Sequence, residues 1–410
     1  MIPRLTLHCA CVAFALSLAA LTRAADDTAP SPYAALHATA LAPTPAGSVA
    51  PWPWQPAPGP AGRDVAILLM GDTNIQQRAD PALAYRHVLP TLRAADLRFA
   101  NLEMAFHPPS QDPAKPDNPH KIGWAHSDPS QVRGLVAAGI DGVGFASNVV
   151  YPLVCLQPTL DTLRAAGISQ TGSGANLAAA RRPLLLERKG VKFGFLQTNS
   201  LNWPESHVAT DTTPGVNPLR AHTAYQPHRR IHEMPGGTPT ILTWPHEEDL
   251  ARLVDDLRAL RPQVDVLIVS MQWGISNSSE IAGYQRTAAR AALEAGADLV
   301  FGHGPHKLQA VEVYRGKPIF YSLGNFVFDW FKQKPNPDGL LLRAVFRGRR
   351  LVRAALVPLK RDAENNPVLL DPASGLGAHM TAELLALSGG GAKLAVEQKE
   401  IVVHGLAPSP

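Results

Sequence analysis

Residues 64–74 read DVAILLMGDTN, and this stretch decides the fold. Its apolar run, Val65 to Leu69, has the length and composition of a buried β-strand, and Gly71-Asp72 predicts that the strand ends in a tight turn. Further apolar runs follow, with amphipathic helical patterns between them, at 97–100, 142–145, 266–269 and 299–301. This alternation is typical of βαβ units and predicts an α/β fold.

The regions between the predicted strands favour helices. They are expected, in chain order, at residues 81–94, 129–138, 160–166, 247–260, 288–295 and 382–387. Lys189-Gly190 predicts a hairpin turn between two short strands. A stretch at about 198–244, rich in Pro, Gly, Thr and His, breaks the alternation and is expected to be a long insertion. Long loops in compact domains are often functional.

The N-terminal residues have the pattern of a secretory signal peptide. Arg4 precedes an apolar run over 5–21, and small residues follow at a plausible cleavage site, so we expect a signal over 1–24. An uncleaved N-terminal anchor is the alternative. Residues 25–60 form a Pro/Ala-rich segment that wraps the domain or acts as a linker, and 61–410 form the globular domain. The expected location is outside the cytoplasm, in the periplasm or cell envelope.

Composition narrows the class of protein. The formal net charge is only +4, so the overall charge balance gives no reason to expect a nucleic-acid partner. Two of the three cysteines lie within the predicted signal, which leaves Cys155 alone in the mature chain. An intramolecular disulfide is then impossible, and stability must come from packing.

Polar residues stand directly after several of the predicted strands. Each can be explained singly as a helix cap, a turn residue or a packed loop histidine. Loops after the carboxyl ends of strands converge in an α/β sheet, so their recurrence predicts one shared site. The residues concerned are Asp72, Asn101, Glu103, Asn148, Gln272, His303 and His306.

The order of these motifs resembles that of the capsule-synthesis CapA family, over about residues 62–360. The matching segments are Gly71-Asp72, Ala100 to Glu103, Gly139 to Asp141, Ala146 to Asn148, Ala165 to Ile168, Gly172 to Asn176, Gln272 to Gly274, Gly302 to His306 and Tyr321 to Phe326. The resemblance implies a metallophosphoesterase-like fold, a four-layer α/β/β/α sandwich. Enzymes of that fold use Asp, Asn and His at strand ends to hold two metal ions, which activate water.

Two departures from the family pattern affect the expected metal site. Ser147-Asn148-Val149 has valine where the family has histidine, and Gln272-Trp273-Gly274 has glutamine in place of another histidine. Valine cannot bind an ion, and an amide oxygen is a weak ligand for a transition metal. The sequence therefore predicts one divalent ion (Zn, Mn or Fe) or none. The candidate ligands are Asp72, Glu103, Asn148, His303 and His306.

The same residues suggest chemistry without a metal. A carboxylate, Asp72 or Glu103, facing an imidazole, His303 or His306, can act as general base and acid. Proton abstraction beside a carbonyl and hydrolysis of an amide are both compatible with such a pair. Candidate substrate-binding residues are Asn101, Asn148, Gln272, Trp273 and Asn325.

The insertion contains several basic residues, which predict a basic flap over the pocket that would suit an anionic chain. These residues are His207, Arg220, His222, His228, Arg229, Arg230 and His232.

Three functions remain open at this point. The resemblance implies a component of capsule or poly-γ-glutamate biosynthesis or processing, acting on an anionic polymer or peptide-like substrate and working beside a membrane-bound polymer synthase. The second function is a hydrolase or epimerase of a peptide or small molecule. The third is a polyanion-binding protein without catalytic activity.

Overall fold

The computed structural model describes residues 64–110, 117–121, 123–331 and 339–407. The predicted signal peptide and the Pro/Ala-rich segment lie outside the described residues. None of the helices formed by the described residues is long and apolar enough to cross a membrane.

The larger sheet is built around the strand that opens the domain. β1 (Asp64–Asn74) pairs in parallel with β2 (Leu97–Leu102) on one side and antiparallel with β16 (Gly339–Arg347) on the other. The strand order is β19-β20-β17-β16-β1-β2-β3-β4, with β15 paired to β1 and β18 to β17. The remaining strands are β3 (Gly142–Gly144), β4 (Ser169–Thr171), β15 (Asn325–Phe328), β17 (Arg350–Arg361), β18 (Pro367–Leu369), β19 (Lys393–Glu397) and β20 (Glu400–His404).

The smaller sheet has six strands in the order β13-β14-β12-β11-β7-β6. Its members are β6 (Leu184–Arg188), β7 (Val191–Asn199), β11 (Val266–Gln272), β12 (Leu299–His303), β13 (Val311–Tyr314) and β14 (Lys317–Phe320). The predicted hairpin is confirmed, since β6 and β7 are antiparallel and Lys189 and Gly190 have φ of 50° and 76°. Positive φ at both positions is what a tight hairpin turn requires.

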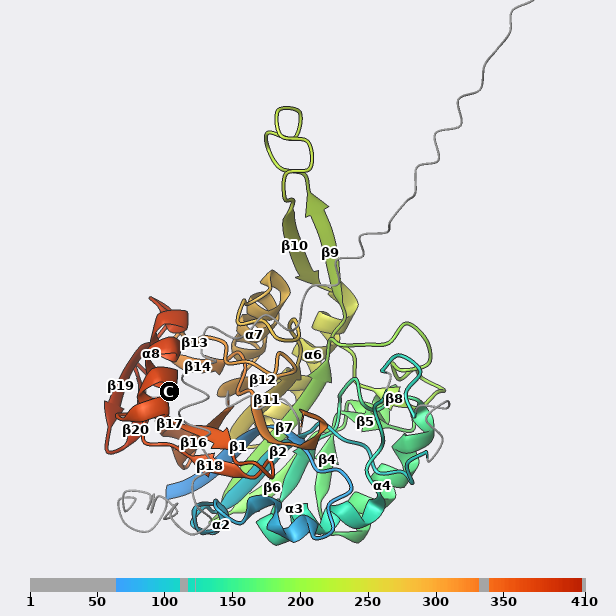
Figure 1. The fold of residues 1–410 in the computed structure, drawn as a ribbon, viewed down its shortest axis with the longest axis vertical. Helices are drawn as coiled ribbons and strands as arrows, with labels where there is room; N and C mark the ends of the chain where they lie inside the picture. The colour runs from blue at the N-terminus through green and yellow to red at the C-terminus, as the bar shows by residue number, and fades with distance from the viewer. Residues whose placement is uncertain (1–63, 111–116, 122, 332–338, 408–410) are drawn as a thin grey trace, which may run out of the picture. The chain divides into compact units, whose positions relative to one another are not determined.

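The two sheets pack face to face through one apolar core. Alternate residues of β1 divide between two environments: Val65, Ile67 and Leu69 face the second sheet, and Leu68 and Met70 face a helical layer. A separate core fills the space between the second sheet and its helices. This order of layers, visible in Figure 1, confirms the predicted α/β/β/α sandwich.

The helices formed by the described residues are α2 (Leu89–Arg93), α3 (Val132–Ala138), α4 (Leu156–Ala165), α5 (Leu177–Ala180), α6 (Glu247–Leu260), α7 (Gly283–Glu294) and α8 (Gly375–Ser388). Helices α2, α3 and α4 pack on the first sheet, α6 and α7 pack on the second, and α8 contacts β13 of the second sheet and β17 of the first. The helix predicted over 81–94 is instead a 3₁₀ turn, Pro81–Tyr85, followed by α2. Pro90 has no N–H to continue a helix, so it lies in the first turn of a new one.

The first strand is longer than the sequence predicted. β1 does not end in a turn at Gly71-Asp72 but continues to Asn74, with a register shift against β2 between Met70 and Asp72. A Cβ on Gly71 would lie 2.0 Å from the carbonyl oxygen of Gly324, so only glycine allows that backbone to approach. The Asp72 N–H then donates to this same oxygen at 3.0 Å, and Asp72 lies within the sheet.

The insertion contains a short strand, β8 (Gly215–Val216), that pairs with β5 (Ser173–Gly174), and a two-stranded ribbon. β9 (Ala221–Gln226) and β10 (Thr240–Pro245) form this ribbon and pair only with each other among the described strands. Figure 1 shows the ribbon extending away from the end of the sandwich near α6 and α7.

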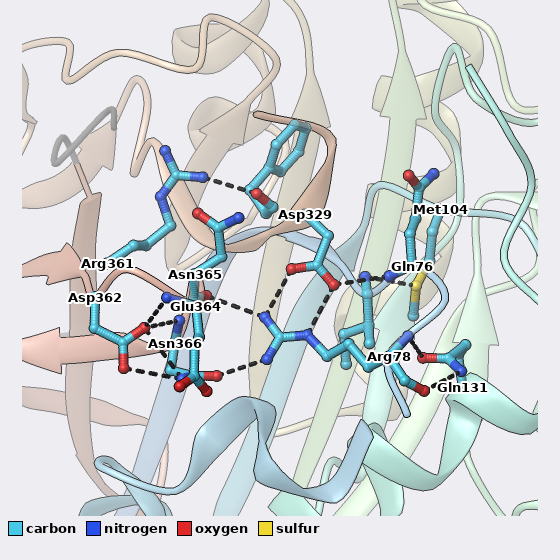
Figure 2. Close-up of polar contacts among 12 residues, drawn as sticks. Gln76, Arg78, Met104, Gln131, Asp329, Arg361, Asp362, Glu364, Asn365 and Asn366 are labelled. Atoms are coloured by element: carbon cyan, nitrogen blue, oxygen red, sulfur yellow. Dashed lines mark hydrogen bonds and ion pairs between the residues drawn. The ribbon is translucent and has the colours of Figure 1, made fainter. Parts of the chain in front are cut away.

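A buried polar network ties the loop after β1 to the end of β15 (Figure 2). The Arg78 guanidinium donates to both carboxylate oxygens of Asp329 at 2.8 and 2.7 Å, and to the Asn366 side-chain oxygen at 2.6 Å. The Gln76 N–H donates to Asp329 at 2.9 Å, and Arg78 also exchanges hydrogen bonds with Gln131. The two chain segments that flank the candidate site are therefore held together by ionic hydrogen bonds.

Arg78→Met should destabilise the fold strongly. The Arg78 and Asp329 side chains are 10% and 0% exposed, so the substitution leaves Asp329 as a buried charge without its counterion. We expect the free energy of unfolding, measured by urea titration, to fall by about 3–5 kcal/mol. The matched control is Arg164→Met, whose ion pair with Asp161 is 73% and 54% exposed and should contribute about 0–1 kcal/mol. Similar losses of unfolding free energy in both variants would contradict the view that Arg78 stabilises the fold as the counterion of buried Asp329.

Candidate functional site

The strand ends of both sheets meet in one buried polar cluster. Asp72 is the register partner of Asn101 and Asn325 in the first sheet, and Gln272 is the partner of His303 in the second. The Asn101 amide links the sheets, because its nitrogen donates to Asp72 Oδ1 at 2.7 Å and to Gln272 Oε1 at 3.0 Å. The structure thus brings the predicted strand-end residues together.

Asp72 and His306 form an ion pair at the centre of this cluster. His306 Nδ1 lies 2.9 Å from Asp72 Oδ2 and also 2.9 Å from Asn325 Oδ1. Asp72 has no exposed surface, whereas His306 is 7% exposed and is the member of the pair that reaches the surface. His306 has φ of 57°, an unusual backbone conformation for a residue with a side chain.

The ion pair sets the charge of both partners. Burial alone would raise the pKa of Asp72, but the hydrogen bond and positive charge of His306 outweigh it and lower that pKa. Burial alone would lower the pKa of His306, but the Asp72 carboxylate outweighs it and raises that pKa. Both partners are therefore stabilised in their charged forms.

Glu103 is a second buried carboxyl group with a different environment. Its Oε2 accepts hydrogen bonds from the Ser147 hydroxyl at 2.6 Å and the Gln272 amide at 2.9 Å. Burial, followed by the negative charge of Asp72, raises the pKa of Glu103. The two carboxyl groups therefore have pKa values shifted in opposite directions, as in sites that separate an acid from a base.

Asn148 connects Glu103 to a lysine that the sequence analysis missed. We assign the Asn148 amide with its oxygen toward Lys121, because the oxygen then accepts from Lys121 Nζ at 3.0 Å and the nitrogen donates to Glu103 Oε1 at 3.0 Å. Burial lowers the pKa of Lys121, and the charges of Glu103 and Asp72 oppose that shift. Lys121 follows no predicted strand, so its position in the sequence gave no signal.

His303 lies deeper than His306 and has another partner. Its Nε2 lies 2.9 Å from the Ser270 hydroxyl, which also accepts from Gln197 at 3.2 Å. Burial lowers the pKa of His303 to about 4, although the Asp72 charge opposes the shift. Of the four carboxylate–histidine pairs left open by the sequence, the structure forms Asp72–His306. Ser270 and Gln197 are polar residues inside apolar strands, which is the signal that would have identified them.

Trp273 does not belong to the site. Its ring is fully buried in the core between the second sheet and its helices, and its Nε1 donates to the Tyr321 carbonyl at 2.8 Å. The structure therefore does not bring the Trp273 side chain, a predicted substrate-binding group, to the polar cluster, because this side chain lies on the outer face of the sheet. By contrast, Asn325 Nδ2 is a buried donor without a hydrogen-bond partner among the described residues.

The cluster does not fit the two-metal centre implied by the resemblance. The described residues contain no group of three or more His, Cys, Asp or Glu side chains arranged to hold an ion. Hydrogen-bond donors from Asn101, Ser147 and Gln272 face the carboxylate oxygens that would be ligands. Val149 is fully buried and supplies no donor atom. Amide and hydroxyl groups satisfy these carboxylates in the way that metal ions would elsewhere.

A cleft of about 670 Å³ lies beside the cluster. Trp203 and His207 line the cleft and also contact the loop that contains Ser147 and Asn148, called the site loop below. Trp203 Nε1 donates to the Asn148 carbonyl at 2.7 Å, and His207 Nε2 lies 3.1 Å from the Ser147 carbonyl. The other lining residues are Ser200, Asn202, Pro204, Ser206, Val208, Thr210, Thr213, Arg220, Ala221, His222 and His246. None of the residues that line the cleft is acidic.

The predicted basic flap is formed only in part. His207, Arg220 and His222 line the cleft, but His228, Arg229, Arg230 and His232 lie between β9 and β10 and are not among its lining residues. The difference arises because β9 and β10 pair as a ribbon, which carries its connecting segment away from the sandwich (Figure 1).

Comparison with known proteins identifies the family. The model of the bacterial capsule synthesis protein family, PGA_cap, matches residues 63–330, which include the buried cluster and most of the domain. The chain belongs to this family. Val149 and Gln272 both lie within the part of the chain that matches this family.

The individual relatives described next share 25–27% of aligned residues with this chain. Two uncharacterized proteins of Sinorhizobium fredii are 27% identical over 60% of this chain, which spans 61% of their length. Capsule biosynthesis protein CapA of Bacillus anthracis is 25% identical over 72% of this chain and 66% of its own. Among solved structures, a phosphatase from Mycoplasma pneumoniae is 12% identical, with a TM-score of 0.38 over 75% of this chain and 91% of that one. The layer order described above, rather than this overlap, defines the fold.

His207 should make stability depend on pH. Trp203 N–H donates to its Nδ1 at 3.3 Å, so the ring is neutral with its proton on Nε2, and burial lowers its pKa to about 4. An unfolded histidine has a pKa of about 6.5. Below that pH the unfolded chain binds more protons, so we expect His207 to reduce stability by about 3 kcal/mol as pH falls from 6.5 to 4.

Urea unfolding across this pH range tests the expectation in wild type and His207→Gln. The glutamine amide can still donate to the Ser147 carbonyl but does not titrate. The decline in stability with falling pH should be shallower in the variant. An identical decline in both proteins would contradict the neutral state assigned to His207.

The side chains available as metal ligands also predict how many metal ions the protein binds. We expect at most one weakly held divalent ion per chain, because Val149 offers no ligand atom and Gln272 offers only an amide at positions where the resemblance implies histidines. Elemental analysis of protein purified without chelator, before and after dialysis, measures this directly. Two stoichiometric ions that survive dialysis would overturn the expectation.

Proposed function

We propose that this chain is an exported component of capsule or poly-γ-glutamate biosynthesis that processes an anionic, peptide-like polymer. The observation that carries the proposal is the Asp72–His306 ion pair, 2.9 Å long, within the part of the chain that matches the family. It supplies a positioned acid–base group at a place where the metal ligands of the fold are incomplete. The reaction we favour is therefore amide hydrolysis without a metal pair.

In this mechanism His306 transfers the proton, and Asp72 positions the His306 imidazole. Asp72 accepts from Nδ1, which orients the imidazole and stabilises its protonated form. The neutral imidazole, which forms when the pH exceeds the raised pKa of His306, takes a proton from water as the water oxygen bonds to the amide carbon. The C–N bond then breaks, and the same proton passes to the leaving nitrogen. In this proposal Asn325 Nδ2, a buried donor without a partner among the described residues, binds the carbonyl oxygen on which charge develops.

The surroundings of the pair suit an anionic substrate. Lys121, held by Asn148, supplies a cation beside the two buried carboxyl groups. The adjacent cleft contains Arg220 and three histidines and no acidic residue, so it can accept carboxylate groups of neighbouring polymer units. Trp203 offers an apolar wall that faces the site loop.

We propose that this activity lies in the periplasm or cell envelope, because the N-terminal residues have the pattern of a secretory signal peptide. A membrane-bound polymer synthase is the partner we propose there. Genes for a synthase beside the gene for this chain would support that partnership.

Asp72→Asn and His306→Gln should each abolish processing. Each substitution keeps the size of the side chain but removes the proton-transfer pair, so we expect product formation to fall by about 10²-fold or more. The assay is incubation of the full chain with poly-γ-glutamate, with and without a chelator, followed by analysis of chain length. Activity of the wild type should be insensitive to the chelator.

The matched control is His404→Gln, which alters a half-buried histidine at the end of β20 that pairs with Glu397 of β19, and this variant should retain full activity. Circular dichroism establishes that each variant is folded. Full activity in either site variant would place the chemistry elsewhere. Polymer that binds to the wild type but stays intact would show the chain to be a non-catalytic polyanion-binding protein.

A further inference from the structure

The ribbon formed by β9, β10 and their connecting segment carries an unusual concentration of exposed apolar side chains. Of the twelve large apolar residues that are exposed in the described part of the chain, five lie on it: Tyr225, Met234, Ile241, Leu242 and Trp244. Their exposed fractions run from 45% to 68%. Contiguous exposed apolar groups of this kind mark sites that bind a partner or a membrane.

These side chains lie on both faces of the ribbon. Tyr225 is directly opposite Ile241, so both project from one face, and their neighbours along the strands project from the other. Leu242 and Trp244 lie on that second face, opposite Ala224 and His222. A protein surface would cover one face and leave the second in water. A lipid surface surrounds both faces of a ribbon that enters it.

The base of the ribbon is fixed to the sandwich. Tyr284 N–H donates to the Thr243 hydroxyl at 3.2 Å, and His246 N–H donates to the Arg220 carbonyl at 2.7 Å. Gly283 packs against the Thr243 carbonyl, where a Cβ would lie 2.9 Å from the oxygen. Arg220 is anchored by two hydrogen bonds to the buried Asp249 carboxylate, at 2.7 and 2.9 Å. The apolar residues are therefore held away from the core by a rigid attachment.

The far end of the ribbon is basic. Its connecting segment, residues 227–239, contains Arg229 and Arg230 with two histidines, against a single acidic residue, Glu233. Glu233 pairs with Arg230, which leaves Arg229 as an exposed positive charge in the same connecting segment as exposed Met234. Arginine next to aromatic and aliphatic side chains is the composition of segments that bind anionic lipid surfaces.

We propose that the ribbon is a membrane-docking element whose far end enters the headgroup region of an anionic bilayer. Tyr225 and Ile241 on one face, Leu242 on the other face and Met234 in the connecting segment contact the acyl boundary, and the arginines bind lipid phosphates. The main-chain groups on the outer edges of β9 and β10 have no strand partner among the described residues, so penetration stops where water is still present. This inference is independent of the chemistry proposed for Asp72 and His306.

Vesicle binding of the full chain tests the proposal. Binding is measured by co-sedimentation with vesicles of phosphatidylglycerol and phosphatidylcholine, and with vesicles of phosphatidylcholine alone. All variants share the apolar N-terminal run, so differences from wild type report on the ribbon. We expect Arg229→Glu/Arg230→Glu to weaken binding to anionic vesicles about tenfold or more and to leave binding to neutral vesicles unchanged. Tyr225→Ser/Ile241→Ser should weaken binding to anionic vesicles by a similar factor.

Two control variants change equally exposed residues of the sandwich. Arg133→Glu/Arg164→Glu reverses two charges on the helices over the first sheet, and Leu185→Ser removes an apolar side chain that is 56% exposed on β6. Both should bind vesicles as the wild type does. Unchanged binding of the ribbon variants to anionic vesicles would overturn the proposal. So would a change from dimer to monomer in these variants, measured by light scattering, without any loss of vesicle binding, because a second copy would then be the occupant.

Discussion

One buried amide group holds the site together. Asn101 donates to Asp72 on its own sheet and to Gln272 on the other, and its oxygen accepts from Gln197 at 2.7 Å. Three strands are thus fixed at their ends by a side chain with no exposed surface. In a low-dielectric interior such a network is stable only when its members are satisfied together, so the packing of the two sheets and the polar site depend on each other.

Gln272 and Val149, at positions where the resemblance implies histidines, fit the same network. Gln272 gives the network a neutral group that both accepts and donates, from Asn101 and to Glu103, which a metal-bound imidazole does not do. Val149 fills the adjoining space with apolar volume. Negative charge that metal ions would balance is met here by His306 and, through Asn148, by Lys121. The framework of the capsule-synthesis family is kept while its electrostatics are changed.

The insertion divides into two parts with separate surroundings. Its first part, with Trp203 and His207, packs against the site loop and forms a wall of the cleft. Its second part is the ribbon, whose five exposed apolar residues belong to none of the core clusters and do not line the cleft. A single loop-rich stretch in the sequence thus supplies both a wall beside the chemistry and a surface directed outward.

The sequence by itself determined an α/β fold and the general place of the site, whereas the order of the four layers was implied by the family resemblance. Apolar periodicity in 64–74 and the later runs dictates buried strands, and the polar residues that follow strands gather where those strands end. Only the tertiary structure decided that Asp72 pairs with His306, that Trp273 belongs to the core, and that Lys121 approaches Asn148. The reason is physical: periodicity specifies which face of a strand is buried, whereas the partner of a polar side chain depends on how two sheets and a distant loop meet in space.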